Sequence, residues 1–531
     1  MKEFLYKRRV PLMLIFGGVL TSLALVIPTI GAIQWISLIP AIIALVTIAE
    51  NREIKLKRTY GYGLLFFMSY YLVIFHWFLY MYPLDFAGVS RAAGAVVVLV
   101  AWFGLSFFQT LGSAFVFVVF TLIYRKLFDK FRILTPFLFA AVWTIFEWSQ
   151  TIGWWGVPWG RLCLGQSKAE LLLRSASVFG SYFVTFVIVT VNACIACVVL
   201  NKAWKKTLSV CAACAFTLNL AIGAIVTVSY KDDGDEIRFA AIQGNISSSD
   251  KWNDASLGKT MNIYERYTLE AAENGADAVV WPETALPYDV FDNDFLIEYL
   301  TELAKEADVT IFVSAFTEPD YTDNSNALNN SIVCVNPDGS FGEDIYSKQR
   351  LVPFGEFVPM RDVVMFLIPP LAEIGMLDDD LLFGEESVVL ESEVGIVGCG
   401  ICFDSIYDVI TRKAALNGAE IIIISTNDSW FSDSAALDMH NSQSKLRAIE
   451  TGRYIVRSAN TGISSIIDPL GNVKQSLGAL TEGYVIDDVR TRDQMTPYTF
   501  IGNTFVYLCM AFIVGVFIYS LAFSKRRQDE C

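Results

Sequence analysis

The chain has 531 residues, 54% of them hydrophobic, and a formal net charge of −15 at pH 7. Soluble globular proteins average roughly 45–50% apolar residues, so the composition favours a membrane protein. The acidic balance disfavours nucleic-acid binding, which needs clustered lysine and arginine. The only two histidines are His76 and His440, so a histidine-based metal site is not expected. The cysteines of the polar region, Cys334, Cys399 and Cys402, are too few for a disulfide framework.

The apolar residues are unevenly distributed along the chain. Residues 1–230 are almost continuously apolar, and residues 231–495 have the composition of a soluble domain. Residues 496–531 contain a last apolar run and a basic tail. We therefore predict a transmembrane bundle of seven helices, a soluble domain outside the cytoplasm, and an eighth transmembrane helix with a cytoplasmic tail.

Eight apolar runs have about the length that a membrane-spanning helix needs, which is about 20 residues. In chain order they are Val10–Pro28, Ile33–Ala49, Gly61–Met81, Ala92–Tyr124, Thr135–Trp148, Ala176–Leu200, Leu208–Val228 and Phe500–Phe523. The fourth run is much longer than the others. We interpret it as one long, tilted helix, because two helices there would break the charge alternation of the loops.

Lysine and arginine cluster in every second loop between these runs. Basic loops remain in the cytoplasm, while the other loops are poor in these residues. The clusters lie at residues 2–9, 52–58, 125–132, 202–206 and 525–527. Both termini are therefore predicted in the cytoplasm, and residues 229–499 outside it.

One stretch of the membrane region, residues 146–161, is rich in tryptophan and glycine and also contains Glu147 and Arg161. Tryptophan concentrates at the membrane–water interface, so an aromatic belt is one interpretation. Charged residues within an apolar bundle can also line a cleft through which a lipid enters. The sequence leaves both interpretations open.

Residues 231–495 contain short apolar runs separated by turn residues and helical patterns. The predicted strands are Ile237–Gln243, Ala278–Trp281, Thr310–Ala315, Ser331–Val335, Gly395–Phe403, Ile421–Ser425 and Ile463–Ile467. The predicted helices are Met261–Glu273, Asp294–Glu306, Ile406–Leu416 and Ala435–Thr451. This alternation indicates an α/β layered domain, in which catalytic residues tend to follow the strand ends.

Three polar residues stand at such positions: Glu283, Lys348 and Cys402. Singly, each has an ordinary explanation, as a helix N-terminal acid, a solvated lysine and a small core residue. Together they fit one chemistry. A thiol must lose its proton to become a nucleophile, a carboxylate can take that proton, and an ammonium group stabilises the resulting oxyanion. A cysteine–histidine pair would depend on His440, for which the sequence offers no evident acidic partner.

Cys399 and Cys402 have the spacing of a redox pair. Redox pairs with this spacing begin a helix, whose dipole lowers the pKa of the thiol. Here both cysteines fall on a predicted strand, where residues three apart project to opposite faces. We therefore do not favour a redox site.

Several segments carry a resemblance to a known family. They are Gln243–Ile246, Trp281–Thr284, Lys348–Pro359, Asn427–Phe431, Arg447–Glu450 and Arg457–Gly462. Together with the pattern of membrane runs, they resemble the apolipoprotein N-acyltransferases over nearly the whole chain. The resemblance implies a transmembrane bundle joined to a nitrilase-type αββα sandwich with a Glu-Lys-Cys triad.

The resemblance also implies a role for each matching residue. Glu283 is similar to the general base of the family, Lys348 to the lysine that stabilises the oxyanion, and Cys402 to the acylated nucleophile. The supporting residues that it implies are Glu356, Asp404, Trp252, Asn427 and Trp430. Glu356 matches a second acid and Trp252 an aromatic residue near the lipid entrance. Asp404 departs from the pattern, because the family commonly has glutamate there.

The reaction implied is a two-step acyl transfer without cofactor or metal. Cys402 takes an acyl chain from a phospholipid as a thioester. The N-terminal amine of a diacylglyceryl-cysteine on an apolipoprotein then receives it. The implied location is the bacterial cytoplasmic (inner) membrane, with the catalytic domain on its extracytoplasmic face. Two alternatives are a membrane-anchored nitrilase-like amidohydrolase and a transporter that carries an inactive sensor domain.

Overall fold

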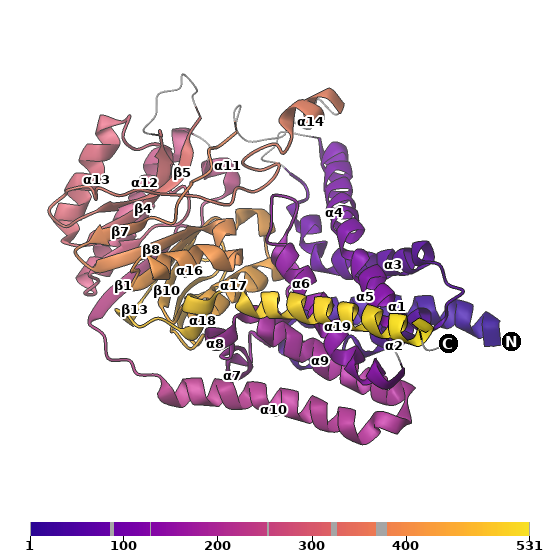
Figure 1. Ribbon diagram of the computed structural model, residues 1–531. Coiled ribbons are helices and arrows are strands. Elements are labelled where there is room, and N and C mark those ends of the chain that lie inside the picture. The colour runs from indigo at the N-terminus through magenta and orange to yellow at the C-terminus, as the bar shows by residue number, and fades with distance from the viewer. Residues whose placement is uncertain are drawn as a thin grey trace. The chain divides into compact units, whose positions relative to one another are not determined.

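The computed structural model describes residues 2–84, 90–127, 129–251, 254–319, 327–367 and 380–529 (Figure 1). The chain forms two compact units. The first comprises Met1–Leu79, Val96–Ser229 and Ile501–Cys531, and the second comprises Tyr80–Ala95 and Tyr230–Phe500. The second unit thus includes a short segment that lies within the predicted membrane region.

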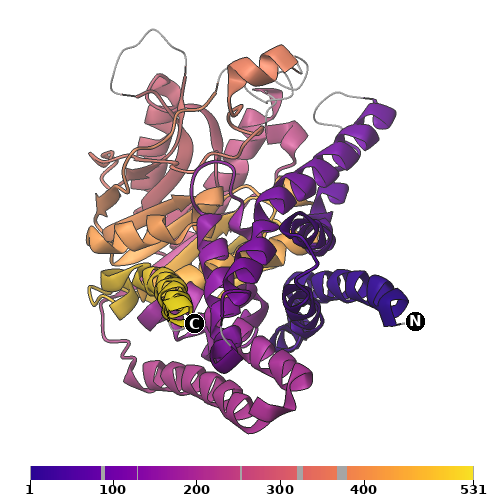
Figure 2. The same ribbon diagram turned by 45° about the vertical axis from the view of Figure 1, so that its right-hand side comes forward.

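The first unit is helical. Its longer helices are α1 (Lys2–Val26), α2 (Ile39–Glu50), α3 (Leu56–Ile74), α4 (Arg91–Ser113), α5 (Phe115–Tyr124), α6 (Thr135–Ser149), α9 (Ser181–Leu200), α10 (Lys205–Ser229) and α19 (Thr504–Asp529). Short helical turns connect them, among them η1 (Pro28–Trp35), η2 (His76–Met81), η4 (Asp129–Leu134), α7 (Glu170–Leu173) and α8 (Ala176–Phe179). Figures 1 and 2 both show α9 and α10 side by side.

Six helical stretches among the described residues are long and apolar enough to cross a membrane. They are Arg9–Val26, Pro28–Glu50, Arg91–Tyr124, Phe131–Ser149, Ser181–Leu200 and Lys202–Ser229. The predicted third run corresponds to α3, whose first turn carries Lys57 and Arg58. The predicted eighth run corresponds to α19, in which Thr504–Ser520 is an apolar stretch among the described residues. The count of eight spans stays a prediction.

The long fourth run forms two helices that follow each other directly, α4 and α5. The residue between them, Ala114, keeps a right-handed helical conformation, and the stretch Arg91–Tyr124 counts as one candidate span. Gly63 of α3 approaches this junction so closely that a Cβ atom there would lie 2.7 Å from the Ala114 carbonyl oxygen. Small residues allow such close packing of helix backbones in membranes.

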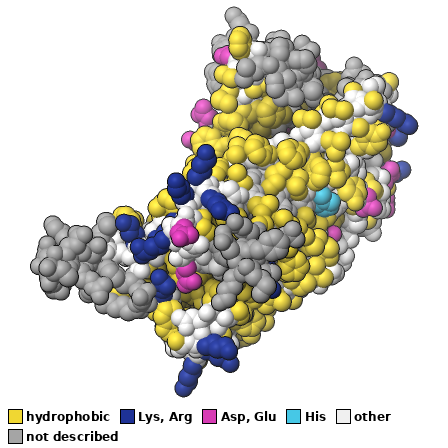
Figure 3. Space-filling model, turned by 90° about the vertical axis from the view of Figure 1, so that its right-hand side faces the viewer, with side chains coloured by type: hydrophobic (Ala, Val, Ile, Leu, Met, Phe, Trp, Pro, Cys, Tyr) yellow, Lys and Arg dark blue, Asp and Glu magenta, His cyan; other side chains and the backbone are white. Residues whose placement is uncertain are grey.

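Exposed apolar side chains cover much of the face drawn in Figure 3. Among the described residues of the helical unit, exposed apolar side chains are frequent on α4 and α10, including Val96, Val100, Phe103, Val210, Leu218 and Ile225. An apolar patch of this extent on a helical unit is typical of a surface that contacts lipid. This protein is a membrane protein.

The charged residues of the tryptophan-rich stretch are buried within the first unit. The Glu147 carboxylate accepts hydrogen bonds from the Trp143 indole (2.9 Å), the Thr185 hydroxyl (2.7 Å) and the Leu162 amide (2.9 Å). Arg161 is also buried, and it donates to the Ser181 hydroxyl. These two charges therefore connect helices and turns of the unit.

The second unit contains two stacked sheets. The strands of the first are β13 (Gly483–Arg490), β1 (Glu236–Gln243), β2 (Ala278–Val280), β4 (Thr310–Thr317), β5 (Asn329–Val335) and β6 (Tyr346–Ser347), in that order, with β3 (Leu286–Asp289) beside β4. The strands of the second are β12 (Val473–Leu477), β11 (Ser464–Ile467), β10 (Tyr454–Ala459), β9 (Ile421–Thr426), β8 (Gly395–Ile401) and β7 (Val389–Ser392). Strands β1, β2 and β4 are parallel, as are β8, β9 and β10.

Helices cover the outer face of each sheet (Figure 1). On the first sheet, α12 (Leu257–Glu273) and α13 (Asp294–Ala307) bury Tyr264 and Leu300 against Ile242 and Val279. Helices α16 (Asp408–Leu416) and α17 (Ala435–Thr451) pack on the second sheet. Because both faces of the central strands are covered, the sequences of these strands are almost continuously apolar. The predicted αββα sandwich is confirmed.

The two sheets meet through polar contacts near their strand ends. The Ser425 hydroxyl, on β9, donates to the carbonyl oxygen of Trp281, which follows β2 (2.8 Å). The Ser458 hydroxyl, on β10, donates to the Ile242 carbonyl oxygen on β1 (2.6 Å). The carboxyl ends of parallel strands from both sheets are therefore brought to one place, which is where the site lies.

Candidate functional site

The Glu283 side chain lies just beyond β2 and is buried, with 6% of the residue exposed. One carboxylate oxygen accepts from Lys348 Nζ at 2.7 Å and from Asn330 Nδ2 at 3.0 Å, and the other accepts from the Asn427 amide at 2.8 Å. Burial alone would raise the pKa of Glu283, but the ammonium groups of Lys348 and Lys251 hold it below its ordinary value. Glu283 is thus ionised at neutral pH.

Lys348 follows the short strand β6, and its side chain is 1% exposed. Its Nζ lies 2.7 Å from a carboxylate oxygen of Glu283 and 2.7 Å from one of Glu356. Its backbone amide donates to the Asn330 carbonyl oxygen, which fixes it to β5. Burial would lower the pKa of Lys348, but the two carboxylates hold it well above the ordinary value.

Cys402 stands on a sharp turn rather than at a strand end. Strand β8 ends at Ile401, and Cys402 begins the short 3-10 helix η9 (Cys402–Ile406). Its φ angle of 48° is unusual for a residue with a side chain. The predicted strand Gly395–Phe403 was therefore too long, because the turn that ends it carries no glycine or proline.

The Cys402 thiol lies beside the Glu283 carboxylate, close enough for the two groups to interact electrostatically. Burial, together with the negative charge of Glu283, raises the pKa of the Cys402 thiol well above its ordinary range. The resting site therefore pairs a neutral thiol with an ionised carboxylate. Cys399 lies three residues earlier on β8 and is fully buried. Burial, and to a smaller extent the nearby Cys334 thiol of β5, raises the pKa of Cys399 well above its ordinary value.

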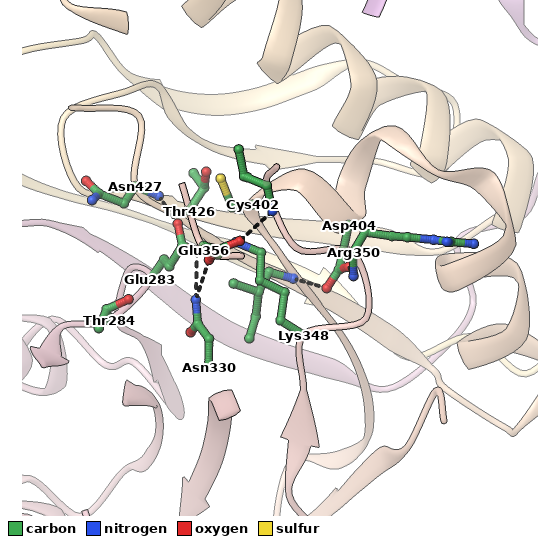
Figure 4. Close-up of polar contacts among 12 residues, drawn as sticks. Glu283, Thr284, Asn330, Lys348, Arg350, Glu356, Cys402, Asp404, Thr426 and Asn427 are labelled. Atoms are coloured by element: carbon green, nitrogen blue, oxygen red, sulfur yellow. Dashed lines mark hydrogen bonds and ion pairs between the residues drawn. The ribbon is translucent and has the colours of Figure 1, made fainter. Parts of the chain in front are cut away.

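Two further residues complete the polar contacts around Lys348 (Figure 4). Glu356 accepts from Lys348 with one oxygen and from the Val352 amide with the other, at 2.8 Å. The Asn330 side chain donates to Glu283 and, at 3.4 Å, to Glu356. No sequence pattern identified Asn330, because an asparagine within an apolar strand has no distinctive spacing.

Asp404 connects the turn at Cys402 to the segment that carries Lys348. Its carboxylate accepts from the Ile401 amide (3.0 Å), the Arg350 amide (2.8 Å) and the Tyr346 hydroxyl (2.8 Å). Burial raises the pKa of Asp404 to about 6. None of these hydrogen bonds joins Asp404 to Glu283 or Lys348. Asp404 instead holds the turn at Cys402 and the segment around Arg350 in place.

The structure places the other predicted supporting residues, Asn427, Trp430 and Trp252, differently with respect to the site. Asn427 contributes its backbone amide to Glu283, and its side chain accepts from Asn460 at 3.0 Å. Trp430 lies in the short turn η10 (Ser429–Phe431) and is half-buried. Trp252 lies outside the described residues.

Lys251 is a second buried lysine at the site, at the end of the short helix α11 (Ser248–Lys251). Its Nζ donates to the Glu283 carbonyl oxygen at 2.7 Å. Burial lowers the pKa of Lys251 to about 8, although Glu283 and Cys402 act in the opposite direction. The sequence showed only a lysine next to Trp252, and nothing in that pattern distinguishes it from a solvated one.

The arrangement can perform acyl transfer through a covalent intermediate. It provides a nucleophile in Cys402, an adjacent proton acceptor in Glu283 and a fixed cation in Lys348. A nucleophile, a base and an oxyanion partner within hydrogen-bonding distance are the groups that such chemistry needs. All three derive from the ends of strands in facing sheets.

Two family models match this chain. The model described as carbon-nitrogen hydrolase matches residues 238–495, and the model described as apolipoprotein N-acyltransferase N-terminal domain matches residues 17–194. The two matches fall on either side of the change in composition near residue 231. Together they extend over most of the chain.

Individual proteins are similar over nearly the full length. The apolipoprotein N-acyltransferase of Gloeobacter violaceus is 29% identical, over 93% of this chain and 91% of its own. That of Geobacter metallireducens is 27% identical, over 98% of this chain and 96% of its own. The solved structure of Saccharomyces cerevisiae Nit3, a member of branch 10 of the nitrilase superfamily, is 20% identical with a TM-score of 0.37, covering 49% of this chain and 92% of that chain.

Proposed function

This chain belongs to the apolipoprotein N-acyltransferase family and is an N-acyltransferase, and from that premise we propose that Cys402 carries the acyl group as a thioester. The donor is a phospholipid and the acceptor is the N-terminal amine of a diacylglyceryl-cysteine on an apolipoprotein. The observation that supports the proposal is the position of the Glu283 carboxylate, which accepts a hydrogen bond from the Lys348 ammonium and interacts electrostatically with the Cys402 thiol.

In the first step, the Cys402 sulfur forms a bond to the acyl carbonyl carbon of the phospholipid. The thiol proton moves to the Glu283 carboxylate, and the carbonyl oxygen becomes an oxyanion. Lys348 has three N–H donors, of which Glu283 and Glu356 take two among the described residues, so a third can stabilise the oxyanion. The ester C–O bond then breaks, the glycerol oxygen takes the proton from Glu283, and a lysophospholipid leaves.

In the second step, the acceptor amine attacks the thioester carbonyl carbon. Glu283 takes a proton from the nitrogen as the amide forms, and the C–S bond breaks. The sulfur then recovers a proton from Glu283, which restores the resting site. A thiolate is a much better leaving group than an alkoxide, which is why a cysteine suits a carrier that must release its acyl group to an amine.

We also propose where the reaction takes place. The acyl chains of both substrates are membrane-bound, so the catalytic unit, residues 231–495, must act at a membrane surface. The basic loops of the membrane region favour the extracytoplasmic face of the bacterial cytoplasmic membrane for this unit. Residues 1–230 and 496–531 then form the transmembrane part.

The test is intact-mass analysis after incubation of the purified protein with phospholipid alone. The wild type should gain one acyl chain, which hydroxylamine removes, and Cys402→Ala should gain none. Cys399→Ser is the matched control, because Cys399 is a fully buried thiol on β8, the strand that leads directly to Cys402, and the variant should be acylated like the wild type. Acylation that persists in Cys402→Ala would overturn the assignment of the nucleophile.

A second incubation separates this function from the two alternatives. Acylated protein is freed of phospholipid and mixed with a diacylated lipopeptide. An N-acyltransferase should convert the lipopeptide to its triacylated form, whereas an amidohydrolase would release free fatty acid into water. A transporter with an inactive sensor domain would not become acylated at all.

A further inference from the structure

A second buried polar cluster adjoins Cys402 on the side of the second sheet. It consists of Asp428, which follows β9, His440 on α17 and Arg457 on β10, each no more than 1% exposed. The acyl-transfer steps proposed above use none of these residues. Buried charged side chains are costly unless they are paired, so their presence next to the nucleophile needs a reason.

The cluster is internally well paired. The Asp428 carboxylate accepts from His440 Nδ1 at 2.8 Å with one oxygen and from Arg457 Nη2 at 2.9 Å with the other. The Thr426 hydroxyl also donates to Asp428, at 3.0 Å. Burial would raise the pKa of Asp428, but His440 and Arg457 hold it far below its ordinary value. The carboxylate therefore holds the imidazole ring at Nδ1.

The opposite edge of the ring faces the nucleophile's backbone. His440 Nε2 lies 3.1 Å from the Cys402 carbonyl oxygen and 3.0 Å from the Ser405 hydroxyl. That hydroxyl in turn donates to the same carbonyl oxygen at 2.7 Å. The ring thus holds the Cys402 peptide group both directly and through Ser405.

A metal ion is not the reason for the cluster. One ligand atom each of Cys402, Asp428 and His440 lie within 4.8 Å of one another. However, the Arg457 guanidinium pairs with Asp428 and also lies 3.1 Å from His440 Nδ1. The positive charge that such a group of ligands would bind is therefore already supplied by an arginine, which is permanently protonated.

We infer that His440 is a positioning residue for Cys402, and this inference rests on the proposed function. Asp428 and Arg457 fix the imidazole, and the imidazole with Ser405 fixes the Cys402 carbonyl. Positive φ angles are unfavourable for residues other than glycine, so the φ of 48° at Cys402 needs such restraint. The restrained turn keeps the sulfur beside Glu283.

The kinetic consequence is specific. If the turn relaxes, the sulfur moves away from its base, while the surfaces that bind the lipid are unchanged. The rate of acyl-enzyme formation at saturating phospholipid should fall, and the phospholipid concentration that gives half of that rate should stay the same. Misplacement of a reacting group by about 1 Å can reduce a rate by about 100-fold.

The first experiment compares His440→Ala with His440→Gln. Alanine removes the donor to the Cys402 carbonyl, whereas the glutamine amide can still donate to it. We expect a loss of about 100-fold in acyl-enzyme formation for alanine, and recovery of most of that loss for glutamine, followed by intact mass over time. Ser442→Ala is the matched control, because it removes a buried hydroxyl from α17 that donates only to the Asp438 carbonyl oxygen. Equal losses in both His440 variants would overturn the inference, because they would make the imidazole a proton carrier.

The second experiment does not depend on catalysis. Hydrogen exchange of peptides that span residues 400–406 should be faster than wild type in His440→Ala and close to wild type in His440→Gln. Unchanged exchange in His440→Ala would overturn the positioning role. Exchange of the other strands reports whether the variant is folded. A wild type that takes up no acyl chain would instead contradict the proposed function, and the exchange result would still decide the role of His440.

Discussion

At the scale of single residues, the site is a balance of buried charges. Glu283 and Glu356 face the ammonium groups of Lys348 and Lys251, which contact Glu283 through its side chain and its carbonyl oxygen respectively. Removing one member of a buried ion pair leaves an uncompensated charge and is strongly destabilising. The charge of each of these residues therefore also shifts the pKa of its neighbours. Measuring activity against pH can for this reason distinguish the roles of the individual residues.

Lys251→Met should move the acid limb of the rate profile to higher pH. The Lys251 ammonium helps to hold the pKa of Glu283 below its ordinary value, so its removal raises that pKa. Because Glu283 must be ionised to take the thiol proton, activity should then be lost at a higher pH on acidification. The measurement is acyl-enzyme formation against pH. The control is Lys259→Met, because the Lys259 side chain is 72% exposed. If the acid limb is identical in the two variants, the role of Lys251 is contradicted.

Glu283→Gln and Glu356→Gln should differ greatly in acyl-enzyme formation. Loss of a general base costs about 10²–10⁴-fold in rate, and we expect Glu283→Gln to fall in that range. Glutamine at position 356 can still accept a hydrogen bond from Lys348, so a loss of about ten-fold or less is expected there. The measurement is the initial rate of acylation by intact mass. Losses of similar size would mean that the proton acceptor has been misassigned.

At the scale of elements, the sequence predicted strands that carry an uninterrupted apolar run and missed strands that are exposed or whose run is interrupted by polar residues. Strand β12 is largely exposed, and β10 contains the buried Arg457 and Ser458, which interrupt its apolar pattern. The Arg457 guanidinium pairs with Asp428, and the Ser458 hydroxyl donates to the Ile242 carbonyl oxygen. Such partners are distant in sequence, and no local periodicity reveals them.

In the site too, features that depend on residues distant in sequence could not be predicted. Glu283, Lys348 and Cys402 could be named from strand ends and from a family resemblance, but the turn at Cys402 could not. We infer that its positive φ is held by a long-range contact from His440 to the Cys402 carbonyl, together with local hydrogen bonds from Ser405 to the same carbonyl and from the Ile401 amide to Asp404. The acidic partner of His440 was likewise invisible, because Asp428 lies twelve positions earlier in the chain.

Asp404→Asn should change how stability depends on pH. Burial raises the pKa of Asp404 to about 6 from 3.8, so the folded protein binds this proton more tightly than the unfolded chain. Its contribution to the free energy of unfolding therefore falls as pH rises from about 4 to about 6, by up to about 3 kcal/mol. Asparagine does not titrate, so the variant should lack this fall, whatever constant cost its lost hydrogen bond adds.

The measurement is the thermal unfolding midpoint in detergent across that range of pH, wild type against variant. Tyr346→Phe is a useful control, because it removes one hydrogen bond to Asp404 and leaves the carboxyl group in place. It should lower the midpoint at every pH by the equivalent of about 1 kcal/mol and keep the wild-type trend. Parallel curves for wild type and Asp404→Asn would show that Asp404 does not titrate in this window.

At the scale of the whole molecule, composition alone separated an apolar helical region from an α/β region. That separation is easy to predict because lipid requires long apolar helices, whereas a sandwich requires short buried strands. The number of spans is harder to derive, since α3 begins with Lys57 and Arg58 and the apolar part of α19 is followed by Lys525, Arg526 and Arg527. These charged residues lower the mean hydropathy of both helices, so the orientation of the loops must decide the number of spans.

The last prediction concerns that orientation. Basic residues mark every second loop, which places Lys57 and Lys205 in the cytoplasm and the whole of the second unit outside it. Asp250 and Gly471 belong to that one compact unit, so they must lie on the same side. Single cysteines at these four positions, in a variant whose exposed native Cys214 is replaced, should divide into two pairs. A membrane-impermeant maleimide should label positions 250 and 471 without disruption of the cytoplasmic membrane, and positions 57 and 205 only after it. One extra or one missing span between positions 57 and 250 would move position 250 to the cytoplasm. Protection of position 250 from the maleimide would therefore refute the eight-span arrangement and the extracytoplasmic location of the acyl transfer.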